Sequence, residues 1–376
     1  MFKFSLVAAL IAASATAGFA QQNWKDRQPK ITTQTSNTTQ LLISVSPVND
    51  RVVWAAGTGG TYVTTTDGGN IWKAAVVPGA ENDEFRDVYA VDEKVAYLMS
   101  IGNNTTDFKI YKTVDGGANW TIQFTNEDPL AFYDCFAFWT PWRGIAHSDS
   151  GNGVFPDLRT ANGKTWESIA ANMPPALPGE ASFAASGTCA ATEGERNAWI
   201  ATGGSTIARI LATRDGGNTW NAYDTPLVSS PSAGGISVEF RDAWHGILGG
   251  GDLSSNTSAQ TATSDDGGQT WKLTNTPPVQ GAIFCLAYVR GNRQGIFHSD
   301  ANGWDGGYFD HDLDRAVVIT AETEPNYSSG PAAWTPDEGH TWFPIPGVSG
   351  NWAVGFANPR SGWFVGNNGQ IIKISF

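Results

Sequence analysis

One short pattern, Ser/Thr-x-Asp-x-Gly-x-x-Trp, recurs along this chain and constrains its fold more than any other feature. Its copies end in a tryptophan, and the tryptophans follow one another roughly every 50 residues with one longer interval: Trp72, Trp120, Trp166, Trp220, Trp271 and Trp342. A period of about 40 to 50 residues is the size of one four-stranded propeller blade, which buries both faces only by stacking on its neighbours. The repeat therefore predicts a β-propeller.

Each copy has the chemistry of a tight turn between two strands. The aspartate can accept from nearby backbone N–H groups, the glycines can take positive φ, and the tryptophan can pack back over the turn. We call each copy a clip and predict that its third residue is structural rather than catalytic. These residues are Asp67, Asp115, Asn162 (in a shortened copy), Asp215, Asp266 and Asp337.

The clips resemble the Asp-box, or BNR repeat, of sialidases, sortilin-type receptors, xyloglucan-degrading hydrolases and photosystem II assembly factors. In those families the motif lies between the third and fourth strands of a blade and is structural. The resemblance implies the same place and the same role for the clips of this chain.

A second repeat, of paired apolar strands between the clips, gives the number of blades. We expect an all-β, single seven-bladed propeller over residues 21–376, with blades near 41–78, 85–125, 131–173, 182–226, 234–276 and 281–346 and a remnant at 350–376. Blade 6 carries an insertion at about 299–330. The remnant has three strands, so we expect residues 22–33 to supply the fourth by pairing with 370–375, which closes the ring.

Residues 1–20 have the pattern of a secretory signal peptide: Lys3, an apolar run and then small residues. The expected location is therefore secreted or periplasmic. We find no other apolar run long enough for a transmembrane segment. The formal net charge of −13 argues against nucleic acid and anionic membranes as partners. We expect a monomer that binds a protein or a glycan.

Three cysteines, Cys135, Cys189 and Cys285, cannot all pair with one another. Cys135 and Cys189 occupy equivalent inner positions of adjacent blades, so a disulfide between them is conceivable. We favour separate buried thiols, because we expect inner strands of neighbouring blades to lie farther apart than the Cα separation of about 4.4 to 6.8 Å that a disulfide needs.

Candidate functional residues lie in loops on the face opposite the clips, where the related families place their binding sites. Carboxylates from different blades could face the axis there, as glycoside hydrolysis requires, or could form an acidic rim. The catalytic candidates are Glu84, Asp134, Asp149, Glu180, Asp252 and Asp300. The binding candidates are Arg86, Tyr133, His147, His298 and Trp304.

The insertion in blade 6 offers weak candidate ligands for a metal ion. Asp300, Asn302 and Asp305 resemble the start of a calcium loop, although Trp304 stands where the third oxygen ligand belongs. The alternative is a solvated acidic loop. We expect no other cofactor.

The single propeller, its clips and the runs at 183–188 and 363–369 resemble bacterial BNR-repeat proteins related to photosystem II stability and assembly factors. That family has a basic surface patch, whereas this chain has an acidic excess. A sialidase is disfavoured, because the Arg-Ile-Pro motif is missing and Arg143, Arg241 and Arg360 fall on the clip face. The leading hypothesis is a secreted, non-catalytic binding propeller; the alternatives are a glycoside hydrolase and a periplasmic assembly factor.

Overall fold

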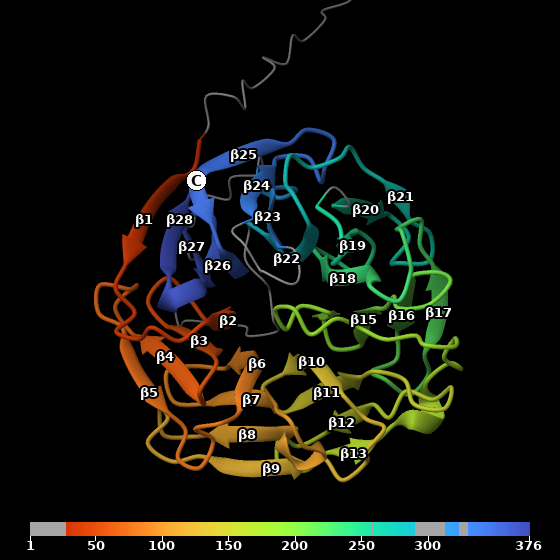
Figure 1. Cartoon of the computed structure of the whole chain (residues 1–376), viewed down its shortest axis with the longest axis horizontal. Helices are drawn as coiled ribbons and strands as arrows, with labels where there is room; N and C mark the ends of the chain where they lie inside the picture. The colour runs from red at the N-terminus through yellow and green to blue at the C-terminus, as the bar shows by residue number, and fades with distance from the viewer. Residues whose placement is uncertain (1–27, 257–258, 290–312, 323–329) are drawn as a thin grey trace, which may run out of the picture.

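The structure, a computed structural model, describes residues 28–256, 259–289, 313–322 and 330–376. Seven antiparallel four-stranded sheets stand around a central axis as the blades of a ring (Figure 1). The predicted all-β, seven-bladed propeller is confirmed. We label the strands of each blade a to d from the axis outward.

Blades 1 to 4 take their strands consecutively from the chain. Their bounds are β2 Leu42–Pro47, β3 Val53–Gly57, β4 Thr61–Thr65 and β5 Lys73–Val76; β6 Glu84–Ala90, β7 Ala96–Ile101, β8 Lys109–Thr113 and β9 Thr121–Thr125; β10 Tyr133–Thr140, β11 Arg143–Ser148, β12 Leu158–Thr160 and β13 Glu167–Ser168; and β14 Ala190–Glu193, β15 Asn197–Ala201, β16 Arg209–Thr213 and β17 Asn221–Asp224.

Blades 5 and 6 continue the same order, and blade 7 is closed from the other end of the chain. Their bounds are β18 Ala233–Phe240, β19 Gly246–Asp252, β20 Gln260–Ser264 and β21 Lys272–Leu273; β22 Ala282–Tyr288, β23 Val317–Glu322, β24 Pro331–Thr335 and β25 Phe343–Ser349; and β26 Asn351–Asn358, β27 Ser361–Gly366, β28 Ile371–Ser375 and β1 Lys30–Gln34. Short 3-10 turns occur at Thr105–Asp107, Ala170–Asn172 and Asn367–Gly369. None of the described helices is long and apolar enough to cross a membrane.

The ring closes through the N-terminal strand, as the sequence predicted. β1 pairs antiparallel with β28, with Lys30 opposite Ser375 and Gln34 opposite Ile371. Gln34 also joins blade 7 to blade 1, because its Oε1 accepts from Nε1 of Trp72 (3.0 Å) and of Trp363 (3.2 Å). The strand begins later than the expected 22–33, and residues 22–27 lie outside the described residues.

The clips are bonded turns at the ends of strands c. In the first clip, Thr65 Oγ1 donates to Asp67 Oδ1 (2.9 Å) and accepts from Gly69 N (3.0 Å), while Asp67 Oδ1 accepts from Ile71 N (3.0 Å). Gly68 and Gly69 take φ of 76° and 87°, which only glycine adopts without strain. The carboxylate therefore acts as the acceptor for a backbone N–H of the turn.

Each clip is also held by the blade before it. Nζ of Lys112 in blade 2 donates to Gly163 O in the blade 3 clip (2.7 Å). Arg214 in blade 4 reaches Asp266 O of the blade 5 clip in the same way (2.7 Å). Basic side chains close to the clips thus cross-link neighbouring blades.

The innermost strand of six blades contains a β-bulge near its start. The bulged residues are Ile43, Arg86, Asp134, Ile236, Phe284 and Trp352. The residue after a bulge reaches the inner strand of the next blade: Asp87 Oδ2 accepts from Phe136 N (2.9 Å), and Ser237 Oγ from Leu286 N (3.0 Å). A bulge re-aims a side chain in this way.

Cys135 and Cys189 form a disulfide with a Cα separation of 5.9 Å, so the prediction of separate thiols was wrong. That prediction treated the inner strands as regular. Cys135 directly follows the bulge at Asp134. In blade 2 the residue after the bulge, Asp87, contacts the inner strand of the next blade. The disulfide therefore takes the place of an inter-blade hydrogen bond. Cys285 is a buried free thiol whose Sγ accepts from Val354 N (3.4 Å).

Candidate functional site

The strand directions define two faces of the ring. Strands within a blade are antiparallel, so the a–b turn and the clip lie on one face, which we call the clip face. The b–c loops and the linkers between blades lie on the other, which we call the opposite face. Each bulge lies near the start of strand a, so the bulged residues gather around the axis toward the opposite face.

Most bulged residues are apolar and pack together. Ile43, Ile236, Phe284 and Trp352 belong to one buried group, the axial cluster, whose other members are Ala185, Leu253 and Ala282, with Leu41 and Phe183 partly buried against it. The rings of Phe284 and Trp352 meet edge to face with centroids 5.3 Å apart. The cluster therefore fills one sector of the axis, over blades 1, 5, 6 and 7.

The remaining bulged residues, Arg86 and Asp134, bring charge to blades 2 and 3. The Arg86 guanidinium carbon lies 5.6 Å from the centroid of the Trp352 ring, and its Nη1 donates to Ala184 O (2.5 Å). Its Nε lies 2.5 Å from Glu84 Oε1, and both side chains are partly exposed. Arg86 thus links the charged sector to the axial cluster, and Glu84 offsets its charge.

Asp134 and Asp149 form a carboxyl pair beside this arginine. Asp134 is 1% exposed, and the two carboxyl groups are hydrogen-bonded to each other. Burial and then the Asp149 charge raise the pKa of Asp134 well above its ordinary value, and burial raises that of Asp149. Asp149 accepts from Ser182 N (2.8 Å), which favours its charged form, so we assign the proton of the pair to Asp134, as the donor to Asp149.

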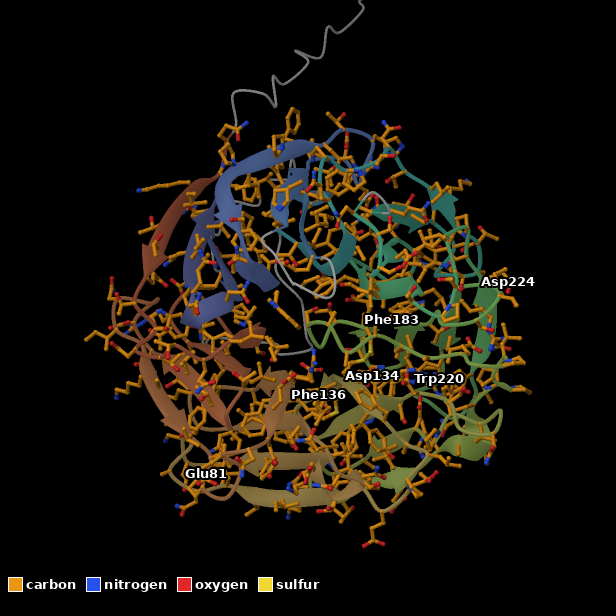
Figure 2. All side chains as sticks on the ribbon, viewed as in Figure 1. Glu81, Asp134, Phe136, Phe183, Trp220 and Asp224 are labelled. Atoms are coloured by element: carbon orange, nitrogen blue, oxygen red, sulfur yellow. A yellow bond between two sulfur atoms is a disulfide. The ribbon has the colours of Figure 1, made fainter. Side chains whose placement is uncertain are left out.

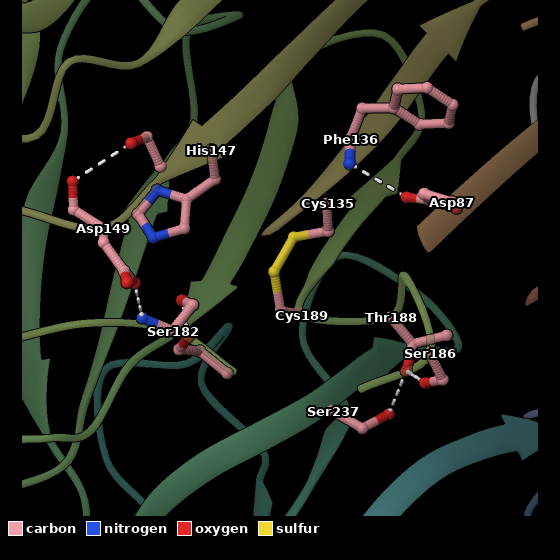
Figure 3. The surroundings of a disulfide bond; sticks show 12 residues. Asp87, Cys135, Phe136, His147, Asp149, Ser182, Ser186, Thr188, Cys189 and Ser237 are labelled. Atoms are coloured by element: carbon pink, nitrogen blue, oxygen red, sulfur yellow. Dashed lines mark hydrogen bonds between the residues drawn. A yellow bond between two sulfur atoms is a disulfide. The ribbon is translucent and has the colours of Figure 1, made fainter. Parts of the chain in front are cut away.

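His147 and Asp157 form a second buried pair in blade 3. His147 Nδ1 lies 3.0 and 2.9 Å from the two Asp157 oxygens, and neither side chain is exposed. Ser148 N also donates to Asp157 (3.1 Å), while His147 Nε2 has no hydrogen-bond partner in the described part of the chain. Asp157 fixes the proton on Nδ1. Figure 3 shows this histidine and Asp149 on one side of the disulfide and the Asp87–Phe136 bond on the other.

Two further candidate carboxylates have partners of their own. Buried Glu180 binds Arg209 Nε (2.9 Å), Thr202 Oγ1 (2.7 Å) and Leu177 N (2.8 Å), an arrangement that anchors the linker before blade 4. Asp252 accepts from Ser254 and Ser232 hydroxyls, and the Ser254 bond lowers its pKa.

Tyr133 is buried, and its hydroxyl donates to Pro156 O (3.0 Å). The candidates Asp300, His298, Trp304, Asn302 and Asp305, which include the calcium ligands, lie outside the described residues. Among residues 28–256, 259–289, 313–322 and 330–376, no group of three or more His, Cys, Asp or Glu side chains is arranged to hold a metal ion.

The structure brings Glu84, Arg86, Asp134 and Asp149 together near the axis at blades 2 and 3. Glu180 and Asp252 lie apart from this group and bind other side chains. Sequence reasoning missed Trp352, Phe284 and Ile43, which it treated as ordinary strand residues. Their common signal is position: each precedes a small or polar residue near the start of strand a (Ser44, Cys285, Ala353). Figure 2 shows Asp134, Phe136 and Phe183 near the centre of the ring, and Glu81 and Asp224 toward its rim.

No family model and no curated relative matches this sequence. Solved structures do match. YCF48 from Cyanidioschyzon merolae is 15% identical with a TM-score of 0.61, over 92% of this chain and 98% of that one. A structure of YCF48 bound to D1 peptide gives the same identity and TM-score, over 93% and 95%. The GH74 xyloglucanase of Xanthomonas campestris is 12% identical with a TM-score of 0.57, over 91% of this chain and 53% of that one.

The comparison with solved structures thus confirms the predicted likeness to photosystem II assembly factors and xyloglucan hydrolases. At these identities the likeness shows the fold alone.

Proposed function

We propose that this chain is a binding propeller that holds a segment of a partner protein on the opposite face. The observation that carries the proposal is the axial cluster, an apolar group around the axis with the Glu84–Arg86 ion pair beside it. Binding sites typically combine apolar anchors with a few polar groups that fix orientation. Phe183 and Leu41 are the members only partly buried, and they are the proposed anchor points.

The state of the described carboxylates favours binding over glycoside hydrolysis. Hydrolysis needs two carboxyl groups about 5 to 9.5 Å apart with the sugar between them. Asp134 and Asp149 are instead hydrogen-bonded to each other, Asp134 is buried, and Glu180 is held by Arg209. A protein ligand is favoured over a glycan by the structural likeness to YCF48, which has been solved with a bound D1 peptide.

We also propose that the chain is exported to the cell exterior or the periplasm. The signal-like residues 1–20 support this, as does the Cys135–Cys189 disulfide, because disulfides persist in oxidising compartments. An assembly role in the periplasm is a special case of the same binding function.

A peptide array with a matched pair of variants tests the proposal. Phe183→Ala removes a partly buried ring from the axial cluster, and Trp244→Ala removes a 53% exposed ring from the clip face. Peptides captured by the unaltered protein should bind Phe183→Ala at least about ten-fold more weakly and Trp244→Ala equally well. Loss of peptide binding with Trp244→Ala alone would place the binding site on the clip face and contradict the proposal. Turnover of xyloglucan that needed Asp134 or Asp149 would establish the hydrolase instead.

A further inference from the structure

Positive charge is segregated between the two faces. Among the described residues, the basic side chains on the opposite face are Arg86, Lys109 and Arg209. They lie at or near the starts of β6, β8 and β16. The other described Lys and Arg residues lie in turns of the clip face or at strand ends beside it: Lys30, Arg51, Lys73, Lys94, Lys112, Arg143, Arg159, Lys164, Arg196, Arg214, Arg241, Lys272, Arg315, Arg360 and Lys373.

The clip-face cations have a structural use that explains their place. Lys373 donates to Gly68 O (3.0 Å), Arg159 to Asn218 Oδ1 (2.9 Å), and Arg241 to Glu338 Oε1 (2.7 Å). Each contact joins one blade to the clip of the next. Inter-blade cross-linking thus accounts for the basic residues on that face and leaves the opposite face with three.

Negative charge is not segregated in this way. Many described carboxylates lie on the opposite face: Glu81, Asp83, Glu84, Asp87, Asp107, Glu127, Asp128, Asp134, Asp149, Asp157, Glu180, Asp224, Asp252 and Glu322. Its three cations are already paired, Arg86 with Glu84, Lys109 with Asp83 (3.3 Å) and Arg209 with Glu180. Burial raises the pKa of Asp87, Asp134 and Glu322, so these three groups do not add to the charge. The other carboxylates still leave this face strongly negative.

The excess is concentrated over blades 2 and 3. Glu81, Glu127 and Asp128 are exposed there, and Asp107 is partly exposed. The Tyr111 hydroxyl donates to Asp83 (2.8 Å), and its pKa is raised first by burial and then by Asp83, with smaller contributions from Asp107 and Glu81. Asp83, Asp107 and Glu81 thus act together on one side chain of blade 2.

A second feature of this region points to a ligand. Asp134 belongs to the same sector, its bulge turns it toward the axis, and it is fully buried. Its Oδ2 accepts no hydrogen bond from any residue that the structure describes. An unmet acceptor on a neutral carboxyl group suits a ligand that brings an N–H donor. Positive charge on the ligand suits the carboxylates around it, Glu81, Asp107, Glu127 and Asp128, which we call the acidic rim.

We propose that the partner segment bound on the opposite face is cationic: an extended stretch of Lys or Arg alternating with apolar residues. The apolar side chains pack on the axial cluster at Phe183, and the cationic ones lie over Glu127 and Asp128. This inference rests on the proposed function and adds the chemistry of the partner. It departs from the basic patch that the sequence resemblance implies.

Three synthetic twelve-residue peptides that alternate Leu with Lys, Gln or Glu test the proposal by calorimetry against the full chain. The Lys peptide should bind at least about ten-fold more tightly than the Gln peptide at low salt, and the difference should shrink several-fold near 0.5 M salt. The Glu peptide should show no binding.

Two double variants with equal charge change decide whether the attraction is local. Glu127→Gln/Asp128→Asn, on the opposite face, should weaken Lys-peptide binding about three- to ten-fold. Glu195→Gln/Asp265→Asn, at exposed positions of the clip face, should leave it unchanged. Equal losses in both would mean general attraction and overturn the inference. Tight binding of the Gln peptide that Phe183→Ala abolishes would overturn the cationic partner yet keep the proposed function. Failure of every peptide to bind, with glycan binding or turnover, would overturn both.

Discussion

The backbone N–H of Phe136 donates to the carboxylate of Asp87 at 2.9 Å and so joins the inner strands of blades 2 and 3. Ser237 and Cys285 make the equivalent contact in later blades, and the Cys135–Cys189 disulfide makes it covalently between blades 3 and 4. The inner ring is thus a chain of links that start one residue after a bulge. The same bulges direct Arg86, Asp134 and Trp352 to the axis. The β-bulge therefore both positions the contacts between blades and places the residues of the candidate site.

The disulfide should be replaceable in part by the hydrogen bond that it substitutes. Cys135→Ala/Cys189→Ala should lower the free energy of unfolding by about 2 to 4 kcal/mol. Cys135→Ser/Cys189→Ala gives residue 135 the hydroxyl that Ser237 uses in blade 5, and should recover about 1 kcal/mol. Urea unfolding of both variants measures the difference, and equal stabilities would contradict the link between the disulfide and the bulge.

The clip aspartates should affect stability without affecting binding. Asp215 accepts from the backbone at Asn218 N (2.9 Å) and Thr219 N (3.0 Å) through the same oxygen. Asp215→Ala should therefore lower the free energy of unfolding by about 1 to 3 kcal/mol. A variant that kept its stability and lost peptide binding would show that the clip belongs to the site.

The sequence could predict the blades because the clips repeat with their tryptophans, and it could predict closure because 350–376 lacks a fourth strand. It could not predict the bulges, which insert one residue into strand a without a distinct residue type. This is why the Cys135–Cys189 bond was missed. Nor could it predict the partners of the candidate acids, because Glu180 meets Arg209 and Asp134 meets Asp149 only through the fold.

Stability should fall as pH rises, in part because of Asp134. Its pKa is raised in the folded state by burial and by Asp149, whereas an unfolded aspartate has a pKa of about 3.9. The folded state therefore binds the proton more tightly, and its contribution is full below about pH 4 and is lost as pH rises toward the folded-state pKa. Asp134→Asn keeps a donor to Asp149 without titrating.

Unfolding free energies at pH 5 and pH 8 check this prediction. The decrease between them should be smaller for Asp134→Asn than for the unaltered chain. Asp87, whose pKa burial also raises, should leave a residual slope. An unchanged or steeper slope in Asp134→Asn would contradict the assignment of the proton to Asp134.

Ring closure should depend on Gln34 beyond the pairing of β1 with β28. Gln34→Leu removes the acceptor shared by Trp72 and Trp363 and the donor to Gly68 O (3.3 Å). We expect a loss of about 1 to 3 kcal/mol. Deleting residues 21–34 should go further, because it exposes the edge of β28 and so promotes aggregation. A deleted chain that stayed soluble with an unchanged melting temperature would contradict closure by β1.

The central claim, that a partner segment binds around the axis on the opposite face, is tested most directly by hydrogen exchange with the Leu/Lys peptide bound. We predict slower amide exchange at 41–46, 83–88, 126–136 and 181–188, where the axial cluster and the acidic rim meet, and no change in the clips around Gly68, Gly163 and Gly267. Protection confined to the clips, with exchange around the axis unaltered, would contradict the account.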